Sequence, residues 1–182
     1  MIAQHRAPDR IATAHLIGER LRESDLAEFQ RIYQDPDVMA WLGGPIPAER
    51  VAAFVTRQIE HWERYGFGIY VLRDPQDGAF VGYAGILHIF VAGVDEIEIM
   101  YGIHAKYWNK GLTTEFAREL KTLALEGLGL PNVVAFTLPT NIGSQRVMQK
   151  SGLAYERDIE WKGLPHVFYR ALRPVERSAA EN

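Results

Sequence analysis

One stretch of the chain, residues 98–115, combines a carboxylate with the residue types that bind a phosphate. Glu98 lies where apolar and polar side chains alternate as in a strand, and a loop of Asn109, Lys110 and Gly111 leads into a helical pattern. Free backbone N–H groups and the positive dipole end at a helix start attract anions, and a glycine permits their close approach. The same residues also fit an ordinary strand–helix turn with a solvated lysine, so both interpretations stay open at this point.

Several other kinds of site are excluded or disfavoured by what the sequence lacks. The lysine precedes the glycine in the loop, which is the wrong order for a nucleoside triphosphate P-loop, and no G-x-G-x-x-G dinucleotide motif occurs. The chain has no cysteine, so disulfides, thiolate-bound metal and a cysteine nucleophile are excluded. Its six histidines lack the H-x-x-x-H spacing of a metal site, and there is no G-x-S-x-G nucleophile elbow. We therefore expect no metal.

The overall charge limits the possible partners. The formal net charge is −3 at pH 7, without the basic stripe of a nucleic-acid-binding protein, so we expect no nucleic-acid partner. No segment approaches the roughly 20 apolar residues of a membrane helix, and residues 1–10 lack the apolar run of a signal peptide. We expect a cytoplasmic protein without a membrane partner, either a monomer or a homodimer.

Strand and helix patterns surround these residues and must position them. Short apolar runs and period-two alternation predict seven strands, at 11–22, 67–73, 79–90, 96–103, 132–138, 153–161 and 167–172. Apolar residues at helical spacing predict helices at 24–33, 48–65, 111–128 and 141–151. This order indicates a mixed sheet flanked by helices, an α/β (α+β) class, and differs from a doubly wound fold. We expect a single domain over residues 1–182, with its core at about 11–172.

Two ordered motifs resemble those of the GNAT acetyltransferase superfamily. Residues 98–115, EIMYGIHAKYWNKGLTTE, resemble motif A, with the run E-I-G-Y-W-L-x-P-x-Y-W-G-K-G-Y-A-T-E-A typical of ribosomal-protein N-terminal acetyltransferases. Residues 141–153, NIGSQRVMQKSGL, resemble motif B, N-x-x-S-x-R-V-x-x-K-x-G-F. The region around residues 25–39 also resembles that ribosomal subgroup, and the match covers about 11–172. The resemblance implies a mostly antiparallel sheet of about seven strands, splayed at an acyl-CoA site.

The same resemblance implies an acyltransferase that uses acetyl-CoA as cosubstrate. It would move the acetyl group directly to a primary amine, of a peptide N-terminus or a small molecule, in a ternary complex. The sequence departs from the family at four positions. Ala105 replaces the common proline, Trp108 replaces Gln or Arg, Thr113 replaces Gly or Ala, and Met148 replaces a tyrosine that acts as general acid in many relatives. The last departure keeps an alternative open, a non-catalytic acyl-CoA-binding or regulatory domain on the same fold.

The resemblance also assigns the cofactor-binding residues. Backbone groups of Tyr101, Gly102 and Ile103 would pair with the pantetheine arm as an added strand. The side chain of Asn141 would bind the arm from the far side. Backbone N–H groups of the loop and helix start would hold the pyrophosphate, namely those of Trp108, Asn109, Lys110, Gly111, Leu112, Thr113 and Thr114.

A general base and an acid complete the expected site. An amine must be neutral to attack, and an α-amine with a pKa near 8 needs less help from a base than a lysine amine near 10.4. Glu98 is the first candidate for the base, with Glu96 and Glu160 as rivals, and each glutamate alternatively is a surface charge. Ser144 is the candidate donor to the departing thiolate, or alternatively a simple first-turn hydroxyl. By analogy with the fold, the residues expected to border the acceptor are Trp41, Glu160 and His166.

Overall fold

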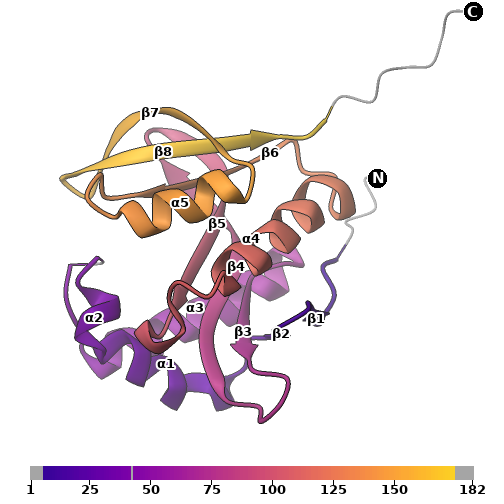
Figure 1. The fold of residues 1–182 in the computed structure, drawn as a ribbon, viewed down its shortest axis with the longest axis vertical. Coiled ribbons are helices and arrows are strands. Elements are labelled where there is room, and N and C mark those ends of the chain that lie inside the picture. The colour runs from indigo at the N-terminus through magenta and orange to yellow at the C-terminus, as the bar shows by residue number, and fades with distance from the viewer. Residues whose placement is uncertain (1–5, 42, 175–182) are drawn as a thin grey trace, which may run out of the picture.

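An eight-stranded sheet runs through residues 6–41 and 43–174, the part of the chain that the computed structural model describes. The ends of the expected 1–182 domain lie outside the described residues. Neighbouring strands follow the order β1-β2-β3-β4-β5-β6-β8-β7 (Figure 1). The strands are β1 (Arg10–Ala12), β2 (Ile17–Arg20), β3 (Ile69–Arg73), β4 (Phe80–Val91), β5 (Val94–Ile103), β6 (Asn132–Thr137), β7 (Ala154–Trp161) and β8 (Leu164–Leu172).

One predicted strand is in fact two, which makes the described sheet one strand larger than expected. Residues 11–22 fold back on themselves as β1 and β2, which pair antiparallel. The turn between them forms because Thr13 donates from both its backbone N–H, at 2.9 Å, and its hydroxyl, at 3.2 Å, to the carbonyl of Leu16. A threonine that bonds its local backbone in this way favours a turn over a continuous strand.

Four helices lie where the periodicity predicts them, and the short helix α2 (Pro36–Met39) lies where the sequence predicts none. The predicted helix at 111–128 is α4, which continues as the π-helical turn η3. Short 3-10 turns, η1 (Glu23–Asp25) and η2 (Ala105–Tyr107), precede α1 and α4. The helices are α1 (Leu26–Gln34), α2 (Pro36–Met39), α3 (Ala48–Tyr65), α4 (Leu112–Thr122) with η3 (Leu123–Gly127), and α5 (Ile142–Lys150).

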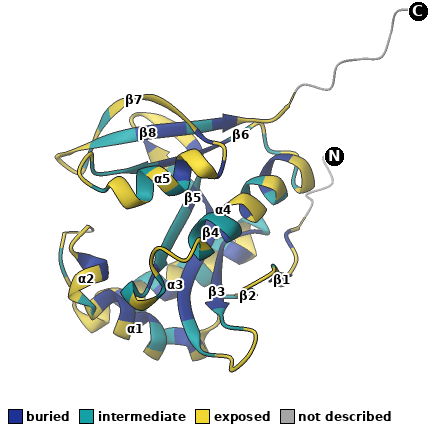
Figure 2. Ribbon diagram, in the orientation of Figure 1, coloured by how far each residue is buried: buried dark blue, intermediate teal, exposed yellow. Residues whose placement is uncertain are grey.

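The central strands are covered on both faces, as the dark blue of β3 and β4 in Figure 2 shows. Ile69 and Val71 of β3 pack into the core beneath α1 and α3. The alternate residues Tyr70 and Leu72 pack into a second core that contains Phe116 of α4. This two-sided burial explains why the strand reads as a continuous apolar run, since successive side chains point to opposite faces.

The sheet splays between β5 and β6, as the resemblance implies. β5 pairs antiparallel with β4 from Val94 to Ile103. On its other side it pairs parallel with β6 at a single register position, Glu98 opposite Val134. In Figure 1, β5 runs between β4 and the group formed by β6, β7 and β8. The part of β5 after Glu98 therefore has an open edge on the β6 side.

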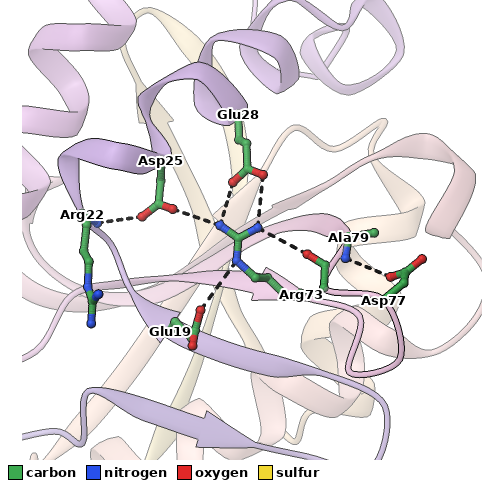
Figure 3. Close-up of polar contacts among 8 residues, drawn as sticks. Glu19, Arg22, Asp25, Glu28, Arg73, Asp77 and Ala79 are labelled. Atoms are coloured by element: carbon green, nitrogen blue, oxygen red, sulfur yellow. Dashed lines mark hydrogen bonds and ion pairs between the residues drawn. The ribbon is translucent and has the colours of Figure 1, made fainter.

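An ion-pair network around Arg73 joins β3 to the layer of helices (Figure 3). The guanidinium donates to Glu28 at 2.8 and 3.1 Å and to Asp25 at 3.0 Å, and lies 3.6 Å from Glu19. Asp25 is buried, and its other oxygen accepts the backbone N–H of Arg22 at 2.8 Å. The network fixes the start of α1 against the sheet.

Replacing this arginine should destabilise the fold. Arg73→Met leaves the buried Asp25 carboxylate without its cation, so we expect the free energy of unfolding to fall by about 2–3 kcal/mol. Urea denaturation measures the change. The control Glu19→Gln removes an exposed carboxylate from the same network and should cost less than about 1 kcal/mol. Equal losses in the two variants would contradict a special role for the buried pair.

Candidate active site

A cavity of about 870 Å³ opens where β5 and β6 separate. Its walls come from β4, β5, the end of β6, the start of α4, α5, one face of α3 and the β7–β8 turn. The cavity therefore passes through the sheet from the α4–α5 side to the α3 side. The structure brings together here most of the residues that the sequence singles out, namely Trp41, Glu98, Tyr101, Gly102, Ile103, Trp108, Asn109, Gly111, Leu112, Thr113, Thr114, Asn141, Ser144 and His166.

The loop before α4 exposes backbone N–H groups to the cavity. Asn109 and Gly111 have left-handed φ angles of +60° and +79°, which curl the loop, and Asn and Gly are the residues that tolerate this conformation. The Trp108 indole N–H donates to the carbonyl of Ile103 at 3.0 Å and so holds the loop against β5. No side chain caps the start of α4, which leaves its first N–H groups for an anion.

Lys110 lies outside the lining of this cavity. Its side chain is exposed, and its ammonium is 5.5 Å from the centre of the Tyr107 ring. Two other cations, Arg146 and Lys150, reach the cavity from α5, where they lie four residues apart on one helix face. Sequence reasoning missed both, although their spacing in motif B was a usable signal.

The start of α5 is tied to β5 by side-chain hydrogen bonds. Asn141 caps the helix, its side-chain oxygen accepting the backbone N–H of Ser144 at 3.1 Å. The Tyr101 hydroxyl donates to the Ser144 carbonyl at 3.2 Å and lies 2.9 Å from the Ser144 hydroxyl. Burial raises the pKa of Tyr101, so the phenol keeps its proton. The sequence predicted a role for the Tyr101 backbone only, but its hydroxyl is the partner of Ser144.

Glu98 and Glu96 point to the same face of β5 but have different surroundings. Glu98 lines the cavity, and burial raises its pKa from 4.5 to about 7, an effect that the Lys162 ammonium opposes. Glu96 lies outside the cavity lining and is held by Arg170 through two hydrogen bonds of 2.6 and 2.8 Å. Glu96 is thereby engaged in an ion pair, whereas Glu98, with its raised pKa, has the properties of a general base at neutral pH.

The three residues expected near the acceptor are placed differently. Trp41 and His166 line the cavity, and the His166 ring packs against Phe136 with centroids 5.7 Å apart. Glu160 is exposed and is not among the lining residues. Its neighbour Trp161 packs inward with the cluster around Phe168, so strand alternation turns Glu160 to the opposite face. The expectation that Glu160 borders the cavity is therefore corrected.

The described residues contain neither a cluster of metal ligands nor a helix that could span a membrane. No group of three His, Asp or Glu side chains in 6–41 and 43–174 is arranged to hold a metal ion. Within the same residues, none of the helices has the length and apolar character needed to cross a membrane.

Comparison with known proteins gives consistent matches. Residues 15–154 match the acetyltransferase (GNAT) domain family. The chain is 26% identical over 164 residues to the uncharacterized protein YkkB of Bacillus subtilis, covering 87% of this chain and 95% of the relative. It is 28% identical over 149 residues to the uncharacterized N-acetyltransferase YnaD of the same organism, covering 78% and 84%. RimL, a ribosomal L7/L12 α-N-protein acetyltransferase solved with coenzyme A, superposes with a TM-score of 0.75 at 14% identity, covering 90% and 97%.

The buried carboxyl predicts a pH-dependent stability effect. The folded pKa of Glu98 is raised, so its contribution to stability is fully present below about pH 4.5 and is lost as the pH rises through about 7. Glu98→Gln should therefore stabilise the ligand-free protein by about 1–3 kcal/mol at pH 8, and by less at pH 5. Thermal melting at the two pH values measures this, with Glu160→Gln as the exposed control. A gain at pH 8 no larger than that at pH 5 would contradict the raised pKa.

Proposed function

The chain belongs to the acetyltransferase (GNAT) family, and we propose that it moves an acetyl group from acetyl-CoA directly to a primary amine in a ternary complex. The chain is an acyltransferase of a family that uses acetyl-CoA. One observation carries the proposal for this chain: a cavity through the splayed sheet, with free helix N–H groups on one side and the Glu98 carboxyl on the other. We also propose one domain over residues 1–182, since a single sheet includes strands from both ends of the described chain.

The open edge of β5 supports the proposed cofactor position. Backbone groups from Tyr101 to Ile103 have no strand partner on the β6 side, and an extended pantetheine arm can supply one. The pyrophosphate would bind the uncapped start of α4 and the loop before it, with Arg146 and Lys150 nearby for further phosphate charge. Coenzyme A is present in the structure of RimL, which shares this fold.

The proposed reaction needs one proton acceptor and one donor. The neutral amine nitrogen attacks the thioester carbonyl carbon, the C–S bond breaks, and the amine loses a proton to Glu98 directly or through water. With a pKa of about 7, Glu98 is largely ionised at pH 8 and still basic enough to accept that proton. The thiolate leaves readily because thiols have a pKa near 8.5, and the Ser144 hydroxyl, bonded to Tyr101, can protonate it.

This arrangement does not favour the alternative of a non-catalytic acyl-CoA-binding domain. The alternative rested on Met148, which stands where many relatives have an acidic tyrosine. Met148 is buried at the cavity wall, and the Ser144–Tyr101 hydroxyl pair provides a donor on the same α5 side. The acceptor class remains a primary amine, of a small molecule or a peptide N-terminus as in the named substrate of RimL.

Acetyl-CoA should stabilise the purified protein. At about 100 times the dissociation constant, binding adds about 2.7 kcal/mol, which raises the melting temperature by about 5–11 °C for a chain of this length. Thermal melting with acetyl-CoA measures the shift, with NAD and ATP as controls. The absence of a shift at saturating acetyl-CoA would contradict the proposed cofactor.

The general base can be tested by removing its charge. Glu98→Gln should lower kcat by about 10²–10⁴ in the release of free CoA thiol, because the amine loses its proton acceptor. The melting shift with acetyl-CoA should remain, since Glu98 faces the acceptor side. Glu160→Gln, outside the cavity, is the matched control and should keep full activity. Unchanged turnover of Glu98→Gln from pH 6 to pH 9 would remove Glu98 as the base.

A further inference from the structure

The charge that lines the cavity is opposite in sign to that of the whole chain. The formal net charge of the protein is −3, yet Glu98 is the one acidic residue among the described lining residues. Two of the lining cations, Arg146 and Lys150, lie on α5 beside the proposed cofactor. The other two, Arg57 and Lys162, lie on α3 and in the β7–β8 turn, on the acceptor side. Neither of these two forms an ion pair within residues 6–41 and 43–174.

Lys162 adopts a backbone conformation that is unusual for a lysine. It is the first residue of the two-residue turn between β7 and β8, with φ of +51°, and Gly163 follows with φ of +76°. Such a turn normally has Asn, Asp or Gly at its first position. The Lys162 ammonium lies 5.6 Å from the centre of the Trp161 ring and close enough to Glu98 to oppose the rise in the pKa of that carboxyl that burial causes. A strained residue that holds a cation beside a base points to a functional role.

One face of α3 brings Arg57 and Gln58 to the acceptor side of the cavity, the compartment that also contains Glu98 and Lys162. One turn further along the helix, His61 accepts the backbone N–H of His88 through Nε2 at 2.9 Å. His88 follows Leu87, the residue of β4 that lies opposite Glu98. The side-chain oxygen of Gln58 is buried beside the cavity and has no hydrogen-bond partner among the described residues.

A second buried polar group, the Tyr83 hydroxyl, also has no hydrogen bond of ordinary geometry among the described residues, although the neighbouring Tyr33 hydroxyl is close enough to oppose the rise in its pKa. Tyr83 lies opposite Gly102 in the β4–β5 ladder, and a Cβ on Gly102 would be 2.8 Å from the tyrosine Cζ and hydroxyl oxygen. The glycine therefore makes room for the phenol at the cavity wall. Burial raises the pKa of Tyr83 to about 12, so it remains a donor. Buried polar groups of this kind almost always have a partner, which a ligand in the cavity would supply.

We propose that the acceptor carries a carboxylate next to its primary amine, as an α-amino acid does. This inference rests on the proposed function and specifies its substrate. The amine lies toward Glu98, with Gln58 and Tyr83 as its polar surroundings. Lys162 and Arg57 bind the carboxylate through charge-assisted hydrogen bonds. The aromatic lining, which includes Trp41, Phe54, Phe136 and Trp161, accommodates an apolar side chain.

The same charges disfavour the polycationic amines. A polyamine or an aminoglycoside would bring several ammonium groups into a compartment whose single carboxylate already faces two cations. Like charges in a partly buried site repel more strongly than in water. An acceptor with one amine and one carboxylate instead places its amine against Glu98 and its carboxylate against Arg57 and Lys162.

Matched acceptor pairs test the inference. L-phenylalanine, L-leucine and L-glutamate are compared with their α-amides, and spermidine is added, with free CoA thiol measured at saturating acetyl-CoA and pH 8. At least one of the three amino acids should have a kcat/KM at least tenfold above that of its amide. The amide has the larger fraction of neutral amine, because it lacks the negative charge that raises the amine pKa. A preference for the acid therefore cannot come from amine ionisation.

Two variants assign the preference to its residues. Lys162→Asn keeps a residue suited to the left-handed turn. The Arg57→Gln/Lys162→Asn double variant should raise KM for the preferred amino acid at least tenfold and reduce the ratio of kcat/KM for the acid to that for the amide toward one. Lys162→Arg should retain the ratio. Arg64→Gln, on α3 but outside the cavity lining, is the matched control and should also retain it.

The outcomes that overturn the inference are distinct from those that overturn the proposed function. If the amides or spermidine have a kcat/KM equal to that of the amino acids, the carboxylate assignment alone is overturned. The same follows if the preference for the acid survives in the Arg57→Gln/Lys162→Asn double variant. The proposed function is overturned if acetyl-CoA shifts the melting temperature but no thiol is released with these acceptors or with a panel of peptides and simple amines. That outcome also overturns this inference.

Discussion

The single register pair between Glu98 of β5 and Val134 of β6 is the constraint on which the site depends. A parallel ladder that stopped earlier would leave Glu98 on a free strand, and one that continued would close the edge of β5. The strand can leave its edge open because its other edge is paired with β4 along its whole length. Backbone groups without a partner are costly when water is excluded, so the open edge favours an extended ligand that replaces the missing strand.

The contrast between Glu98 and Glu96 shows how one strand face provides two kinds of carboxylate. Glu96 has a guanidinium against it and belongs to the ion pair that links β5 to β8 across β6. Glu98, two residues later, lies at the cavity, where burial raises its pKa to about 7 and the Lys162 ammonium only partly offsets this. The ionised form of Glu98 therefore destabilises the folded state. Such a cost is typical of residues placed for reactivity and is offset by packing elsewhere.

Much of the fold and part of the site could be predicted because their signals are local in sequence. Alternation and helical spacing located the sheet strands and helices, and motif A placed a strand, loop and helix start within 18 contiguous residues, 98–115. The prediction failed where a local hydrogen bond at Thr13 turned the chain, and where strand phase put Glu160 outward and Trp161 inward. Lys162 and Gln58 escaped notice because only tertiary packing brings the β7–β8 turn and α3 together around one cavity.

Two arginine networks engage carboxylates that lie outside the cavity lining. Arg73 joins β3 to β2 and α1 through carboxylates, and Arg170 joins β8 to β5, β6 and β7 through Glu96, Asn132 and Glu156. The Arg73 network lies within one part of the sheet, whereas the Arg170 network ties β5 to β6 and β8 through Glu96, two residues before the point at which β5 and β6 separate. The opening between β5 and β6 therefore begins only beyond this tie. Glu96, two residues before Glu98, is thereby engaged with Arg170. Arg57 and Lys162 form no ion pair within the described residues, which leaves both available for the carboxylate of the proposed acceptor.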